Sequence, residues 1–298
     1  MNTRLFALAS LPLLLAACSG EPAVPAPDAS LVRVYGSVGV VRSRVSSLGT
    51  ETEGVAAFGV FGAFASPQAV PTVVPGVPGS CTVTRSAPGE GVGPVSPPMP
   101  PGHFTSLDAG DALTLRTAGG PYARLDKSVF GGQTFYASLF GGEEGATPGP
   151  LPAELRLDIP GAGGGFPAFS GVTFPHAPPL DLGAPNLGQP VAADATFTWA
   201  AAQAGADTTT VVTLSLIQAG PDGTVGAHCL ATDAGSFRLP EVTRNELRQA
   251  GFTAATGISV GRLRSRLVRQ GDAALVVSAS DVLTALTPGN GPSTGGNP

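Results

Sequence analysis

The chain has 298 residues, enough for one large domain or two ordinary ones, and only 12% of them are charged. Its 42 glycines and 30 prolines make up about a quarter of the sequence, twice the usual share, which argues against a mainly helical protein. The formal net charge of −5 provides no global attraction for nucleic acid, so no nucleic-acid partner is expected.

The N-terminal residues have the pattern of an export signal. A short positive stretch, 1–4, precedes an apolar run over 5–15, and the small residues Ala16 and Ala17 then precede Cys18. The apolar run is too short to cross a bilayer core, which needs about 20 residues. These residues resemble the lipobox of bacterial lipoprotein signal peptides. The resemblance covers only this end of the chain and implies cleavage before Cys18 and lipid attachment to that cysteine.

Such an anchor would make the membrane a partner and place the protein in the cell envelope. Ser19, rather than aspartate, follows the cysteine and resembles the pattern that sends such proteins to the outer membrane, which is the expected location. Export also implies an oxidising compartment, in which Cys81 and Cys229 form a possible disulfide. The alternative is two separately buried thiols.

The mature region is expected to be all-β, with two domains. Residues 1–17 form the expected signal peptide and 18–30 a proline-rich tether. Residues 31–188 would form an N-terminal β domain with long Pro/Gly-rich loops, and 189–287 a C-terminal β-sandwich. Short strands between turns are typical of immunoglobulin-like sandwiches. A closed β-barrel with an appended sheet is the alternative, and composition predicts a disordered tail over 288–298.

Strand patterns recur along both halves. Alternating apolar residues over 32–40 predict a half-buried strand, and the run over 55–65 has apolar groups on both faces, as in a strand buried on each side. Proline dominates from 66 to 102 and predicts a long loop. Further strands are expected at 81–84, 113–115, 122–125, 135–140, 155–159, 196–199, 211–217, 225–231, 258–269 and 274–280.

One short helix is predicted over 240–250. Pro240 suits the first helical position, Glu241 the first turn, Arg248 the last turn and Gly251 the terminating position.

No catalytic residue, metal site or cofactor is predicted. Residues 257–261, Gly-Ile-Ser-Val-Gly, match the G-x-S-x-G pattern of serine hydrolases, but an alternating strand follows and no histidine lies downstream. We interpret the pattern as a strand with a glycine bulge. His103, His176 and His228 lack metal-ligand spacing, and His228 is expected to face away from Cys229 on one strand.

Arg262, Arg264 and Arg266 stand at alternate positions and so project from one face of a predicted strand. Because guanidinium groups match phosphate and carboxylate, this row is the candidate anion-binding site for groups of an envelope polymer. The alternative is a charged solvent face or edge strand that prevents aggregation.

The acidic turns and a set of aromatic residues each have a structural and a functional interpretation. Acidic turns at 108–111 and at Asp233 lack the spacing of calcium loops, so turn chemistry is favoured. Phe166, Phe169 and Phe174, with Trp199, are expected to be buried at the domain junction, the alternative being the lining of a sugar or lipid cleft.

Two functional classes remain open. The favoured class is a lipid-anchored envelope protein with a non-enzymatic structural or binding role toward an envelope polymer or a protein partner. The other class is an exported enzyme, a hydrolase or a metal-dependent oxidoreductase, with a site assembled from distant residues.

Overall fold

The computed structural model describes residues 32–47, 50–68, 77–87, 104–140, 150–203 and 208–287. These residues are mostly β-structure with one short helix, which confirms the all-β prediction. The expected signal peptide, the tether, Cys18, His103 and the C-terminal tail lie outside the described residues.

The predicted strands are present, and several of them are longer than expected. The elements are β1 (Val32–Ser47), β2 (Thr50–Gln68), β3 (Cys81–Ser86), β4 (Phe104–Ser106), β5 (Ala112–Thr117), β6 (Gly120–Phe130), β7 (Gln133–Phe140), β8 (Arg156–Ile159), β9 (Phe169–Thr173), β10 (Leu182–Ala184), β11 (Thr196–Trp199), β12 (Thr209–Gly220), β13 (Gly223–Thr232), β14 (Ser236–Arg238), α1 (Glu241–Gln249), β15 (Gly257–Gln270) and β16 (Ala273–Leu286). The short strands β4, β9, β10 and β14 are not among the predicted ones.

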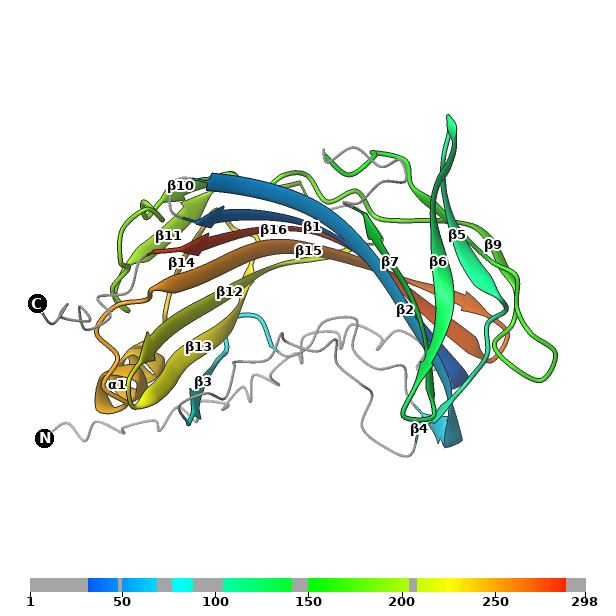
Figure 1. Ribbon diagram of the computed structural model, residues 1–298, viewed down its shortest axis with the longest axis horizontal. Coiled ribbons are helices and arrows are strands. Elements are labelled where there is room, and N and C mark those ends of the chain that lie inside the picture. Colours follow the sequence, from blue (N-terminus) through cyan, green and yellow to red (C-terminus); the bar gives the residue numbers. More distant parts are fainter. Residues whose placement is uncertain are drawn as a thin grey trace, which may run out of the picture.

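One sheet of 13 strands runs through both halves of the chain (Figure 1). Its order is β3-β13-β12-β15-β16-β1-β2-β7-β6-β5-β8-β9, with β4 added to β2, and β10-β11-β14 form a separate small sheet. β1 pairs in parallel with β16 and antiparallel with β2, so the N-terminal strands continue the C-terminal sheet. The halves are therefore not two separate sandwiches. The large sheet ends at β3 and β9, so it does not form the closed barrel of the alternative prediction.

The central strands β1, β2, β15 and β16 are between 14 and 19 residues long and bend into an arch (Figure 1). Two glycines of this bent region lie directly beneath aromatic rings of neighbouring segments. A Cβ at Gly39 of β1 would come within 2.5 Å of the Phe58 ring on β2. Gly36 lies in the same way beneath Phe61 and Phe166. Such cross-strand pairs let a sheet curve while the aromatic ring fills the space above the glycine.

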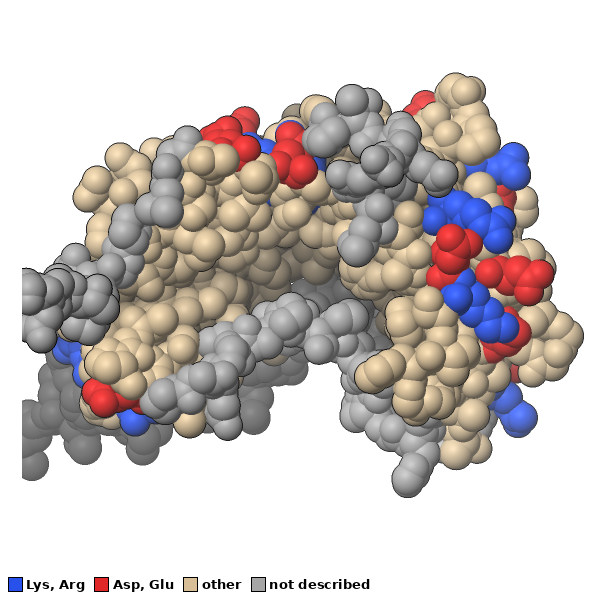
Figure 2. Space-filling view, in the orientation of Figure 1, with Lys and Arg blue, Asp and Glu red and all other residues tan. Residues whose placement is uncertain are grey.

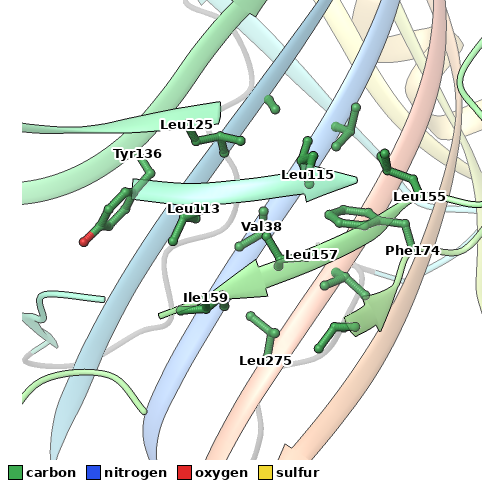
Figure 3. Close-up of a cluster of buried hydrophobic side chains, with 14 of the residues drawn as sticks. Val38, Leu113, Leu115, Leu125, Tyr136, Leu155, Leu157, Ile159, Phe174 and Leu275 are labelled. Carbon is green, nitrogen blue, oxygen red and sulfur yellow. The ribbon is translucent and has the colours of Figure 1, made fainter. Parts of the chain in front are cut away.

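The convex face of the arch is covered by two groups of elements (Figure 1). At one end, β5, β8 and β9 pack over β1, β2 and β16, and Figure 3 shows Leu113 of β5 and Leu157 of β8 facing Val38 of β1. All three side chains are 0% exposed. Burying each such side chain contributes about 1.5 to 3 kcal/mol before entropy is counted.

At the other end, β10, β11 and α1 pack against β12, β13 and β15 to form a second core. The change from the first core to the second falls between Ala177 and Leu180. The expected domain boundary at residue 188 lies near this change. The two cores nevertheless share one sheet, because β16 contributes to the first core from the far end of the sequence.

The predicted helix is present as α1. Glu241 lies in its first turn and Arg248 in its last, as predicted, while Pro240 is the N-cap residue rather than the first helical one. Leu247 is 0% exposed and attaches the helix to the second core.

The four aromatic residues expected at the junction are all buried, but in different cores. Phe166, Phe169 and Phe174 lie in the first core, where Phe166 and Phe169 stack with ring centroids 5.5 Å apart. Trp199 lies in the second core and donates from Nε1 to Asp233 at 2.7 Å. Because they are divided between two cores, these side chains do not line a common cleft.

Candidate functional site

The predicted arginine row does lie on one face of β15, but that face is the covered, convex one. Arg262 is 2% exposed and its Nε donates to Asp233 Oδ2 at 2.8 Å. Its Nη atoms donate to the backbone carbonyls of Pro178, Pro179 and Ala200.

The neighbouring Arg264 is also engaged, since it donates to the backbone carbonyls of His176 and Gln203. The prediction that Arg262, Arg264 and Arg266 form an anion site is therefore wrong for the row as a unit. The elements that cover β15 supply the acceptors that an incoming phosphate or carboxylate would have to replace.

A second ion network crosses the same convex face. Asp281 of β16 is 1% exposed and accepts from Arg42 Nη1 at 2.9 Å and from Arg44 Nη2 at 2.7 Å. The backbone N–H of Leu180 also donates to Asp281, and Arg42 Nε contacts Glu53 at 2.5 Å. Hydrogen-bonded pairing of this kind makes burial of the charges tolerable.

The concave face has the opposite composition. The segments 35–45, 53–60, 211–217, 226–232, 259–267 and 276–284, which we call the compared segments, pair in regular register. Every charged residue of these segments projects to the convex face, and these residues are Arg42, Arg44, Glu53, Arg262, Arg264, Arg266 and Asp281. Outside these segments the concave side of the sheet carries charged residues, including Arg269 of β15 and Arg124 and Asp126 of β6.

The concave side of these segments carries aliphatic, aromatic and hydroxyl side chains. Figure 2 shows a hollow beneath the arch with uncharged residues along its visible walls. The largest group of charged residues lies at the end of the view opposite α1, and others lie near α1 and along the upper edge. Representative concave residues, one from each strand, are Val41 of β1, Phe58 of β2, Ser215 of β12, His228 of β13, Leu263 of β15 and Val282 of β16. All six are half-buried.

In an antiparallel sheet with one open face, the charged residues usually lie on that open face and the covered face is apolar. The covered face here contains the two apolar cores as usual, but it also contains the charged residues of the compared segments. These charges pair with one another and with backbone carbonyls. The concave side of the six compared segments is the candidate functional site, because a surface of this size without charged residues is suited to an uncharged ligand.

A hydrogen-bonded pair lies on the concave face between neighbouring strands. Ser215 Oγ is 2.9 Å from His228 Nδ1, and burial lowers the pKa of His228. A Ser–His pair could suggest a nucleophile and base, but these strands are paired on both sides and their backbone N–H groups serve the sheet. The pair is therefore better suited to hydrogen bonding with a ligand. Sequence inspection missed it, because only the β12–β13 register brings the residues together.

Cys81 and Cys229 form a disulfide between the edge strand β3 and its neighbour β13. Cys229 is 5% exposed and belongs to the second core, whereas His228 lies on the concave face. The two residues thus project from opposite sides of β13, as predicted.

The serine-hydrolase-like pattern forms the start of β15, a regular strand rather than a strand-to-helix turn. Ser259 is on the concave face, and its hydroxyl accepts from Thr284 Oγ1 at 3.2 Å.

The acidic turn at 108–111 is held by contacts within the protein. Tyr136 Oη accepts from the Ala109 N–H at 2.8 Å and lies 2.8 Å from the Gly110 carbonyl oxygen. Burial raises the pKa of Tyr136 to about 12. Hydrogen bonds from Lys127 and Gly110 lower the pKa of Asp108. The turn interpretation accounts for these residues.

A cleft of about 700 Å³ opens beside β5, β8 and β9, away from the concave face. Arg116 Nε and Asp158 Oδ2 lie 2.9 Å apart at its wall, and Asp158 also accepts from Ser170 and from the Gly171 N–H. The Asp158 carboxylate already has hydrogen-bond partners within the protein, and the cleft is wide open to water. The cleft is therefore a weaker candidate binding site than the concave face.

Among the residues that the structure describes, no three His, Cys, Asp or Glu side chains gather as a metal site would require. His176 is exposed and His228 is half-buried on the concave face. Within the same described ranges, no helix has the length and hydrophobicity needed to cross a membrane.

No protein-family model matches the chain, and no curated protein sequence matches it either. The class of protein is therefore described from its fold and its candidate site. The chain is an all-β protein with one arched sheet, and over the six compared segments the covered face carries the charged residues while the concave face carries none.

Proposed function

We propose that this protein is a lipid-anchored protein of the cell envelope, in the outer membrane, that binds an uncharged and largely apolar ligand on the concave face without catalysing a reaction. The observation that carries the proposal is the absence of Asp, Glu, Lys and Arg from the concave side of the six compared segments.

The chemistry of this face favours an acyl chain or a similar neutral chain. Some of its polar side chains hydrogen-bond to one another, as in the Thr284–Ser259 and Ser215–His228 pairs, so fewer polar groups would lose water without a replacement when a chain binds. Burial of apolar ligand surface then stabilises the complex by about 25 cal/mol per Å² before ordering costs are subtracted. An anionic polymer is disfavoured, because its charged groups would meet no Lys or Arg side chain on the concave side of the six compared segments.

We expect Val41→Asp to weaken binding of a neutral apolar probe by about tenfold or more, because it would place an unpaired carboxylate in the middle of the face. Val41 of β1 is half-buried and lies between Ser280 of β16 and Ala56 of β2. The measurement is a fluorescence titration with N-phenyl-1-naphthylamine, together with mass spectrometry of lipids extracted from the purified protein.

Val41→Thr is the matched control, since it keeps the shape of the side chain and adds no charge. It should retain most of the binding. If a folded Val41→Asp variant binds the probe as tightly as the wild type, the concave face is not the binding site.

The anchor has its own test. Cys18→Ser is expected to abolish acylation and to move most of the protein out of the membrane fraction, because Cys18 is the residue that the lipobox resemblance assigns to the lipid. Intact-mass spectrometry of the mature N-terminus and cell fractionation measure the two effects. A wild-type protein with an unmodified Cys18, or unchanged membrane retention in the variant, would refute the anchor.

A further inference from the structure

The turn between β6 and β7 presents two exposed apolar side chains. Phe130 is 80% exposed and Val129 is 64% exposed, and Gly131 and Gly132 follow with φ of 58° and 78°. We call residues 128–135 the β6–β7 tip, and none of them is charged. Because neighbouring residues of a strand point to opposite sides, the β6–β7 tip is apolar on both sides and cannot bury both side chains against its own sheet.

The β6–β7 tip lies at the end of the arch where the chain enters the described fold. Val32 pairs with Gln68 at the end of β2, and β4 pairs with the last part of the same strand. Ser106 of β4 in turn accepts from the Thr134 N–H of β7 at 2.8 Å, and Figure 1 shows the β6–β7 turn beside β4. The chain from Cys18 to Val32 can reach at most about 50 Å. A lipid on Cys18 therefore keeps this end within that distance of the membrane.

We propose that the β6–β7 tip inserts Phe130 and Val129 into the surface of the lipid bilayer that holds the anchor. This inference rests on the proposed lipid anchor at Cys18. An aromatic ring beside an aliphatic side chain, with no charge in the tip, suits the boundary between headgroups and acyl chains. The acylated N-terminus and the β6–β7 tip then form two attachments at one end of the arch, and this end faces the membrane.

The first test uses the full acylated protein reconstituted in phosphatidylcholine vesicles. In the Phe130→Trp variant, lipids brominated on their acyl chains are expected to quench the introduced tryptophan. The wild type is the control, because its single tryptophan, Trp199, is 7% exposed in the second core and should be unaffected. Equal emission of the variant with and without bromine would overturn the proposal.

The second test uses the non-acylated Cys18→Ser protein and the same neutral vesicles. Phe130→Ser is expected to reduce vesicle partitioning about tenfold, which corresponds to losing the burial of one aromatic side chain. Val242→Ser is the matched control: Val242 is 63% exposed on α1, which packs at the opposite end of the arch (Figure 1), and its replacement should have no effect. An equal loss in both variants, or no loss for Phe130→Ser, contradicts insertion of the β6–β7 tip.

The two proposals fail in different ways. If the anchor is wrong, mass spectrometry finds Cys18 without lipid, yet the non-acylated protein still partitions through the β6–β7 tip. If the tip proposal is wrong, the acylated protein stays on the vesicles while the introduced tryptophan remains unquenched.

Discussion

Asp281→Ala is expected to lower the free energy of unfolding by about 3 to 5 kcal/mol, as found when one member of a buried ion pair is removed. The variant would leave Arg42, which is 7% exposed, without its aspartate partner and would also remove an acceptor from Arg44 and from the Leu180 N–H. Because Leu180 begins the second core, the loss should also loosen the chain between the two cores. Urea denaturation followed by circular dichroism measures the change.

Asp126→Ala is the control for this experiment. Asp126 pairs with Arg124 at 2.7 Å, but both side chains are mostly exposed, at 69% and 65%. Removing such a pair should change stability by less than about 1 kcal/mol. If the two variants were equally stable, the Arg42–Asp281–Arg44 network would have no structural role.

Loss of the disulfide is expected to have an effect of similar size. The double variant Cys81→Ala, Cys229→Ala should have a free energy of unfolding about 2 to 5 kcal/mol lower than the wild type, because the bond closes a loop of 148 residues and so restricts the unfolded chain. It also holds the edge strand β3, whose neighbour in the sheet is β13.

The measurement is thermal or urea denaturation of the double variant beside the oxidised wild type. The wild type treated with reductant serves as a second comparison, since it keeps both side chains while breaking the bond. Identical midpoints for all three samples would show that the bond is absent or unimportant in the purified protein.

The two ion networks also explain how a long, smoothly curved sheet keeps its register. Arg42 stands opposite Asp281 in the parallel β1–β16 pair, and Arg262 stands opposite the same aspartate from β15. A slip by one residue would turn these charges to the concave face and bring concave residues into the cores. Pairing on the covered face therefore favours the register that keeps charged residues off the concave side of the compared segments.

Local patterns in the sequence were sufficient for much of the secondary structure. The alternation over residues 32–40 identified β1, and the Pro240 to Gly251 signals identified α1 within one residue at each end. These features depend on residues only a few positions apart, so the sequence alone is enough to predict them. Arg42 and Arg44 continue the alternation beyond residue 40, and this was the one available signal for the missed ion network.

By itself, the sequence determined the all-β class, the position of the helix, and which residues of a strand share a face, because a strand's side-chain period of two is a local property. It predicted correctly that Arg262, Arg264 and Arg266 lie on one face and that His228 and Cys229 lie on opposite faces. Only the tertiary structure decided that β1 pairs with β16, that Cys81 meets Cys229, and that the arginine face is covered while the neutral face is open. These outcomes depend on pairing and packing between segments far apart in the chain, which local periodicity does not encode.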